Sequence, residues 1–152
     1  MDLKEALAEA FSGLQYEGSV DRFVAYWFTK DSVINADVLG VVARLAELSS
    51  VELYLATGQE HYRANFLWND LGFKEHFKEI FYSAKLGHLK NTPEFFETIN
   101  RMLDISPPER PLYFDDQMEI VALACEAGWD ASMFESAEDV VNHRQIRDLL
   151  TE

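Results

Sequence analysis

Four short apolar runs rich in β-forming residues alternate with helical segments from residue 51 onward, and this alternation constrains the fold most. The runs are VELYLA (51–56), EIFYSA (79–84), PLYF (111–114) and WDASMF (129–134). Strands that alternate with helices through short connections form right-handed crossovers, which place the strands parallel to one another. The sequence therefore predicts an α/β fold in which a three-layer, Rossmann-like parallel sheet is flanked by helices.

Residues with strong capping preferences mark where the intervening helices begin and end. A polar side chain before a helix binds its free N–H groups, and a glycine after a helix accepts the left-handed backbone conformation. The predicted starts are Asn35, Thr92 with Pro93, and Ser136 with Asp139; the predicted end is Gly72.

The first 34 residues carry helical patterns and no strand pattern. Apolar residues recur at helical spacing over residues 3–11, and residues 20–28 resume the pattern with many aromatic side chains. We expect Tyr26, Trp27 and Phe28 to pack in the core or at the interface between these helices and the core. The chain is predicted to form one compact unit, with residues 1–34 as a helical region and residues 35–152 as the α/β core.

Polar side chains follow three of the apolar runs, where each predicted strand ends. Thr57 ends the first run, Lys85 and Lys90 follow the second, and Asp115 and Asp116 end the third. Parallel α/β sheets bind ligands at the carboxyl ends of their strands. Carboxylates hold Mg²⁺, a hydroxyl binds phosphoryl oxygens, and a lysine offsets developing charge. These residues together predict a phosphoryl site with Mg²⁺.

Each of these residues also has a purely structural interpretation. Thr57 could cap the helix that follows it, and the Asp115–Asp116 pair could stabilise a helix N-terminus through the helix dipole. Lys90 alone is typical of a solvated surface lysine. Their occurrence at successive strand ends favours a common site.

Composition excludes several classes of partner. The net charge is −14, from 27 acidic and 13 basic residues, which argues against nucleic-acid binding and against docking on anionic membranes. The single cysteine, Cys125, cannot form an intramolecular disulfide, so we expect a cytoplasmic protein in which Cys125 is a small buried apolar residue. The four histidines lack the spacing of metal ligands.

Three segments resemble motifs of the haloacid-dehalogenase (HAD) superfamily of hydrolases, in the order that the family shows. They are LATGQEHYRANFLW (55–68), SAKLGHLKNTPEFF (83–96) and LYFDDQMEIVALACEAGW (112–129). The segment YWFTKDSVINADVL (26–39) also resembles the place where the helical cap rejoins the core in that family. The resemblance implies that residues 1–34 are a cap remnant.

The resemblance also implies roles for individual residues. Thr57 would bind phosphate, Lys90 would be the motif lysine, and Asp115 with Asp116 would bind Mg²⁺. Asn91 stands where the family usually has a proline. The family's reaction begins with an Asp-x-Asp pair at the end of the first strand, where one carboxylate attacks the substrate and the other transfers protons. No such pair follows an apolar run within residues 1–50.

The fold is therefore expected to lack the usual first, nucleophile-bearing strand, which in the family lies between the Thr57 strand and the Asp115 strand. Removing a strand leaves a gap of about 10 Å and exposes two edges with unpaired N–H and C=O groups. The remaining strands could close up, a second copy or another segment could fill the gap, or the chain could be a poorly stable fragment. A homo-oligomer would cover the exposed edges.

Two functional hypotheses of different classes follow. The first is a Mg²⁺-dependent HAD-type hydrolase, a phosphatase acting on a small phosphorylated substrate, whose nucleophile strand would come from upstream of residue 1 or from another chain. The second is a non-catalytic HAD-derived binding or interaction protein that keeps the Mg²⁺ and phosphate site, or only the scaffold.

Overall fold

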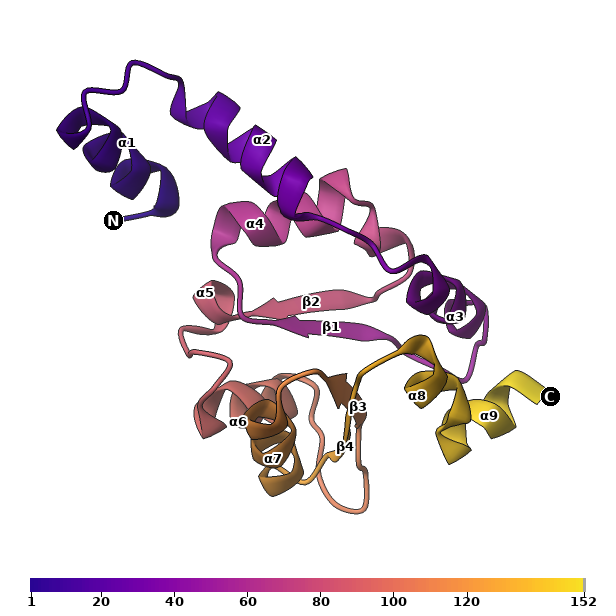
Figure 1. Ribbon diagram of the computed structural model, residues 1–152. Coiled ribbons are helices and arrows are strands. Elements are labelled where there is room, and N and C mark those ends of the chain that lie inside the picture. The colour runs from indigo at the N-terminus through magenta and orange to yellow at the C-terminus, as the bar shows by residue number, and fades with distance from the viewer. Residues whose placement is uncertain (152) are drawn as a thin grey trace.

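Helices and short strands alternate from residue 51 onward in the computed structural model, which describes residues 1–151 (Figure 1). The strands are β1 (Tyr54–Thr57), β2 (Glu79–Tyr82), β3 (Leu112–Asp115) and β4 (Asp130–Met133). The helices are α1 (Leu3–Gly13), α2 (Val20–Asp31), α3 (Ala36–Ala46), α4 (His61–Asn65), α5 (Ser83–Leu86), α6 (Pro93–Met102), α7 (Met118–Glu126), α8 (Ala137–Asn142) and α9 (Arg144–Thr151). All four predicted strands are confirmed, because each coincides with one of the four apolar runs.

The four strands form two parallel pairs rather than one sheet. β1 pairs with β2, with Tyr54 opposite Glu79, and β3 pairs with β4, with Leu112 opposite Asp130. Within residues 1–151 no ladder joins the two pairs. The α/β class is confirmed, whereas the single continuous Rossmann-like sheet is not observed. An isolated strand pair is marginally stable, so each pair depends on the helices that cover it.

Two clusters of buried side chains join the helices to the strands. Helices α6 and α7 contribute to an aromatic core that comprises Phe81, Phe95, Phe96, Ile99, Ile120, Ala124 and Trp129. Helices α3, α8 and α9 contribute to an aliphatic core that comprises Val41, Leu45, Val140 and Ile146. Along β3, Tyr113 packs against the aromatic core, and its neighbours Leu112 and Phe114 pack against the aliphatic core. This alternation is the period of two that a strand with both faces covered requires.

Two of the three predicted helix starts are capped as expected, and the predicted glycine end is observed. The Asn35 side chain accepts hydrogen bonds from two N–H groups of the first turn of α3, and Ser136 with Asp139 forms the predicted capping box of α8. Gly72 has a φ of +75°, the left-handed conformation expected after a helix. Thr92 does precede α6, but its hydroxyl donates to the carbonyl of a preceding loop residue (2.8 Å) and leaves the helix N-terminus uncapped.

The sequence QEHYRANFLWNDL before Gly72, residues 59–71, has a helical pattern, but the helix observed there is interrupted. It begins as α4 and continues as the π-helical turn η1 (Phe66–Asp70), in which the N–H of Leu71 donates to the carbonyl of Phe66, five residues earlier (3.0 Å). A 3₁₀ turn, η2 (Phe73–Glu75), follows. A π-helical turn widens the helix by one residue, which rotates the side chains beyond it relative to α4.

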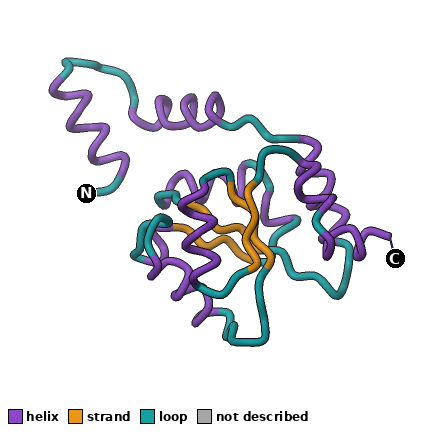
Figure 2. Tube along the Cα trace, turned by 60° about the horizontal axis from the view of Figure 1, so that its bottom comes forward, coloured by secondary structure: helices purple, strands orange, loops and turns teal. Residues whose placement is uncertain are grey.

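The N-terminal helices project from the body of the molecule, as both Figure 1 and Figure 2 show. α1 has no buried residue, and α2 buries only Val24 and Phe28. Phe28 is buried as expected, whereas Tyr26 and Trp27 are exposed and lie outside the core, although the Trp27 ring contacts the Phe28 ring at a centroid distance of 5.5 Å. Only one face of α2 is covered by the rest of the chain, and on that face Phe28 contacts Phe66. The aromatic side chains on its other faces are exposed to solvent.

The solvent side of α7 carries the free thiol. Ile120 and Ala124 of α7 are buried, whereas Cys125 is exposed, which contradicts the expectation of a buried cysteine. One residue along a helix turns the side chain by about 100°, so the neighbour of a buried alanine need not share its face. Across residues 1–151, the helices are too short or too polar to cross a membrane.

Candidate functional site

The carboxyl ends of β1 and β3 meet at Lys90. Gly58 directly follows Thr57 at the end of β1, and a methyl group on its Cα would stand 3.5 Å from Cβ of Lys90. The Lys90 Nζ atom lies 2.5 Å from Oδ2 of Asp115, the last residue of β3. The structure therefore brings the predicted hydroxyl strand, lysine and acidic strand together at one edge.

Backbone contacts fix the loop that carries Lys90. The Lys90 N–H donates to the hydroxyl of Ser83 (3.1 Å), the first residue of α5. Ala84, which follows Ser83 in α5, donates its N–H to the carbonyl of Gln59 (3.2 Å) in the loop after β1. These two bonds tie the loops after β1 and β2 together, so the lysine does not depend on the proline that is absent at position 91.

Asp115 is the most constrained charged residue of the site. Its side chain is 5% exposed, and Oδ2 accepts hydrogen bonds from the Lys90 ammonium and from the Tyr113 hydroxyl (2.7 Å). Oδ1 accepts the N–H of Gln117 (3.1 Å). Burial raises the pKa of this carboxyl, but the hydrogen bonds from Lys90 and Tyr113 outweigh burial and hold the pKa below its usual value. Asp115 is therefore an anion in the folded chain at neutral pH.

Tyr113 joins this charged group to the aromatic core. Its ring makes edge-to-face contacts with Phe96 and Trp129, at centroid distances of 6.0 and 5.3 Å. Burial and the hydrogen bond to Asp115 raise the pKa of the phenol, so its proton stays in place to donate to the carboxylate. The orientation of Asp115 thus depends on packing in the core as well as on charge.

The purely structural interpretations of Thr57 and the acidic pair fit less well than the shared site. The helix after β1 is capped by Glu60, whose carboxylate accepts the N–H groups of Tyr62 and Arg63, and not by Thr57. Asp115 does accept one N–H in the turn before α7, but its main partners come from outside that turn. Asp116, the other acid of the pair, is exposed at the same edge.

Lys85, the other lysine after the second strand, lies outside the site. Its ammonium pairs with Glu79 at 2.5 Å on the surface of β2. The order of residues did not show which of the two lysines reaches the acidic pair. The fold shows that it is Lys90, because Lys85 lies on the short helix α5 and its side chain turns back along β2.

Three site residues escaped the sequence analysis, namely Ser83, Tyr113 and Gln117. Tyr113 had a usable signal, because residues two apart on a strand face the same side and Tyr113 precedes Asp115 by two. Ser83 and Gln117 contribute through turns whose geometry the sequence pattern does not specify.

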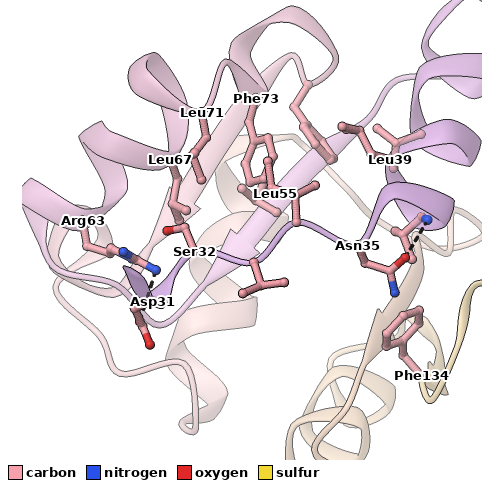
Figure 3. Close-up of a pocket in the computed structure, with 15 residues that line it drawn as sticks. Asp31, Ser32, Asn35, Leu39, Leu55, Arg63, Leu67, Leu71, Phe73 and Phe134 are labelled. Carbon is pink, nitrogen blue, oxygen red and sulfur yellow. Dashed lines mark hydrogen bonds and ion pairs between the residues drawn. The ribbon is translucent and has the colours of Figure 1, made fainter. Parts of the chain in front are cut away.

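An apolar cavity of about 370 Å³ opens on the α3 face of β1 (Figure 3). Its lining includes Leu55 of β1, Val38 and Leu39 of α3, and Phe134, which directly follows β4. The Arg63 guanidinium lies at one end, where it donates to the carbonyl of Phe28 (3.0 Å) and pairs with Asp31 (3.2 Å). The remaining lining residues are Ser32, Val33, Ile34, Asn35, Val42, Leu67, Leu71, Phe73 and Phe77.

Comparison with known proteins adds no assignment. No protein-family model matches the chain, and no curated protein matches it significantly. The interpretation of the site therefore depends on its own residues.

Proposed function

We propose that this chain is a HAD-like protein that binds a phosphorylated small molecule together with Mg²⁺ at the carboxyl ends of β1 and β3. The observation that carries the proposal is Lys90, whose side chain runs from Gly58 at the end of β1 to Asp115 at the end of β3. A hydroxyl, an ammonium and two carboxylates at one edge are the groups that phosphoryl recognition uses. A cytoplasmic location is part of the proposal and is supported by the single cysteine.

The anion would be held by the chain's own donors. The Thr57 hydroxyl at the end of β1 and the N–H groups of Gly58 and Gln59 after it would donate to a phosphoryl oxygen. Lys90 contributes positive charge, although Asp115 already compensates part of it. The lysine can serve both groups because an ammonium has three donors, of which Asp115 takes one.

The carboxylates fit Mg²⁺ in a limited way. Mg²⁺ keeps several waters and needs only one or two carboxylates besides phosphate oxygens. Asp116 is exposed and would hold the ion directly. Oδ1 of Asp115 accepts one hydrogen bond, from the N–H of Gln117, so its second lone pair would be free to bind the ion. Among residues 1–151, no three His, Cys, Asp or Glu side chains cluster as a preformed cage. When bound, the ion would neutralise phosphoryl charge.

Hydrolysis of a phosphate monoester is a second candidate function. The order of hydroxyl, lysine and acidic pair along the chain favours it, because that order is the one in the HAD resemblance. The reaction also needs an attacking carboxylate, and within residues 1–151 no strand between β1 and β3 supplies one. Binding is therefore the function that the geometry supports best, and turnover would require an aspartate from elsewhere.

Titration calorimetry with inorganic phosphate, with and without Mg²⁺, tests the binding proposal. We expect phosphate to bind the wild-type chain in the presence of Mg²⁺, and Lys90→Met, Thr57→Val and Asp116→Asn each to weaken it. Lys85→Met is the matched control and should bind as the wild type does, since Lys85 faces Glu79. Absence of phosphate binding to the folded wild-type chain would refute the proposal.

A p-nitrophenyl phosphate assay with Mg²⁺ separates binding from hydrolysis. Turnover that Asp115→Asn abolishes would establish the hydrolase. Phosphate binding without turnover at high protein concentration would leave the chain as a binding protein.

A further inference from the structure

The apolar cavity on the α3 face of β1 shares no residue with the proposed phosphoryl site. Its volume of about 370 Å³ is that of a small-molecule site and exceeds the voids that close packing leaves in a core. Every apolar side chain that lines it keeps part of its surface accessible, although Val41 and Leu45 on the same helix α3 are buried. The chain therefore leaves this apolar volume unfilled.

Several elements contribute the apolar lining of the cavity (Figure 3). β1 contributes Leu55, α3 contributes Leu39, and the irregular turns η1 and η2 contribute Leu67 and Phe73. The linker between α2 and α3 also lines the cavity, and Val33 in that linker is almost fully exposed. Apolar side chains that meet water on a concave surface favour an apolar ligand, because binding removes that surface from water.

The polar side chains of the lining are few, and two of them are occupied by local hydrogen bonds. The Ser32 hydroxyl donates to the carbonyl of Phe28 (2.6 Å), and the Asn35 side chain caps α3. The other two polar side chains of the lining are Asp31 and Arg63. Arg63 supplies the positive charge of the lining, at one end of the cavity (Figure 3).

The Arg63 guanidinium is held in place but retains free donors. Its side chain is 12% exposed, and it donates one N–H to the Phe28 carbonyl and one to Asp31. Its central carbon also lies 5.0 Å from the centroid of the Phe28 ring and 5.6 Å from that of Phe66. A guanidinium has five N–H donors, so three lack a protein partner within residues 1–151. A fixed guanidinium with free donors matches the two oxygens of a carboxylate.

We propose that the cavity binds an aliphatic carboxylate of about eight carbons, with its hydrocarbon chain against the apolar walls and its carboxylate on Arg63. At about 30 Å³ per heavy atom, the cavity holds about twelve heavy atoms, which suits a chain of this length. The ligand would be a free acid in solution, because a net charge of −14 opposes docking on an anionic membrane. The proposal does not rest on phosphate or Mg²⁺ binding.

Asp31 would compete with the ligand for the same cation. Its side chain is 64% exposed, and it accepts one hydrogen bond from Arg63 (3.2 Å). Exposed ion pairs contribute little, so Asp31 can turn toward water when a carboxylate binds. Removing the charge of Asp31 should therefore strengthen binding of an anion and leave binding of a neutral ligand unchanged.

Titration calorimetry with sodium octanoate, in buffer that contains EDTA and no phosphate, tests the proposal. We expect saturable binding, with hexanoate about tenfold weaker because two fewer methylene groups are buried. Octan-1-ol should also bind at least about tenfold more weakly, since it lacks the charged partner of Arg63. Arg63→Met should remove the difference between octanoate and octanol, and Asp31→Asn should strengthen octanoate alone. Arg101→Met, at an exposed position of α6, is the matched control and should bind both ligands as the wild type does.

Leu39→Trp gives a test that leaves the contacts of Arg63 intact. Leu39 is partly exposed on α3, so a larger ring there would fill the cavity without entering the core, and octanoate binding should be lost. Binding that persists in this variant would place the ligand elsewhere and overturn the proposal. So would octanol that binds the wild type as tightly as octanoate, or a folded wild-type chain that binds neither. Displacement of octanoate by excess inorganic phosphate would also overturn it, because the carboxylate would then lie at the Lys90 edge.

Discussion

The ion pair between Lys90 and Asp115 gives the sharpest quantitative prediction, because Asp115 is buried and Lys90 is mostly buried. At 2.5 Å and an effective dielectric constant of about 20, the gross attraction is about 7 kcal/mol. Removing one partner of a buried pair typically costs about 3–5 kcal/mol, since the other charge stays buried. Lys90 is 20% exposed, so water reduces the loss, and we expect Lys90→Met to lower the free energy of unfolding by about 2–3 kcal/mol at neutral pH.

The pH dependence of this loss identifies its cause. The pKa of Asp115 is lowered in the folded chain, so its stabilising contribution is present above the unfolded pKa of about 4 and disappears as pH falls through the folded pKa. In Lys90→Met the carboxyl loses its cation and protonates at higher pH. The difference in free energy of unfolding between wild type and variant should therefore shrink as pH falls below about 4.

Urea unfolding followed by circular dichroism measures both effects. Lys85→Met is the matched control, since its pair with Glu79 has the same length but its side chains are 34% and 39% exposed. We expect that variant to lose at most about 1 kcal/mol, with a weaker dependence on pH. Equal losses in the two variants, or a Lys90→Met loss that persists in acid, would refute the reasoning.

Four further substitutions test core packing, one side-chain hydrogen bond and the backbone conformation at two glycines. Phe96→Ala should lower the free energy of unfolding by about 3–5 kcal/mol in urea, because the ring is fully buried in the aromatic core. Asn100→Ala should cost about 1–3 kcal/mol and shift the emission of Trp129, whose indole N–H donates to the Asn100 side chain at 2.6 Å; unchanged emission would contradict that contact. Gly128→Ala should destabilise by about 1–2 kcal/mol because its φ is +93°, whereas Gly40→Ala within α3 should stabilise by about 0.5–1 kcal/mol in the same melts; the same sign for both would contradict the backbone argument.

The candidate site was predictable at the level of elements and less so at the level of contacts. Thr57, Lys90 and Asp115 follow successive strands, and parallel strands bring their carboxyl ends to one edge, so their proximity follows from the pattern. The contacts of two hydroxyl groups could be read only from the coordinates: the Tyr113 hydroxyl donates to the Asp115 carboxylate, and the Ser83 hydroxyl accepts the backbone N–H of Lys90. Their positions depend on side-chain packing and a turn, neither of which has a sequence period.

The sequence by itself determined the four strands, the starts of α3 and α8, and the α/β class, because these depend on local periodicity and on capping residues a few positions apart. Only the tertiary structure decided that the strands form two separate pairs, that Lys90 rather than Lys85 reaches Asp115, and that Cys125 and Tyr26 are exposed. Strand pairing and side-chain burial depend on contacts between residues far apart in the chain. Local patterns restrict such contacts but do not choose among them.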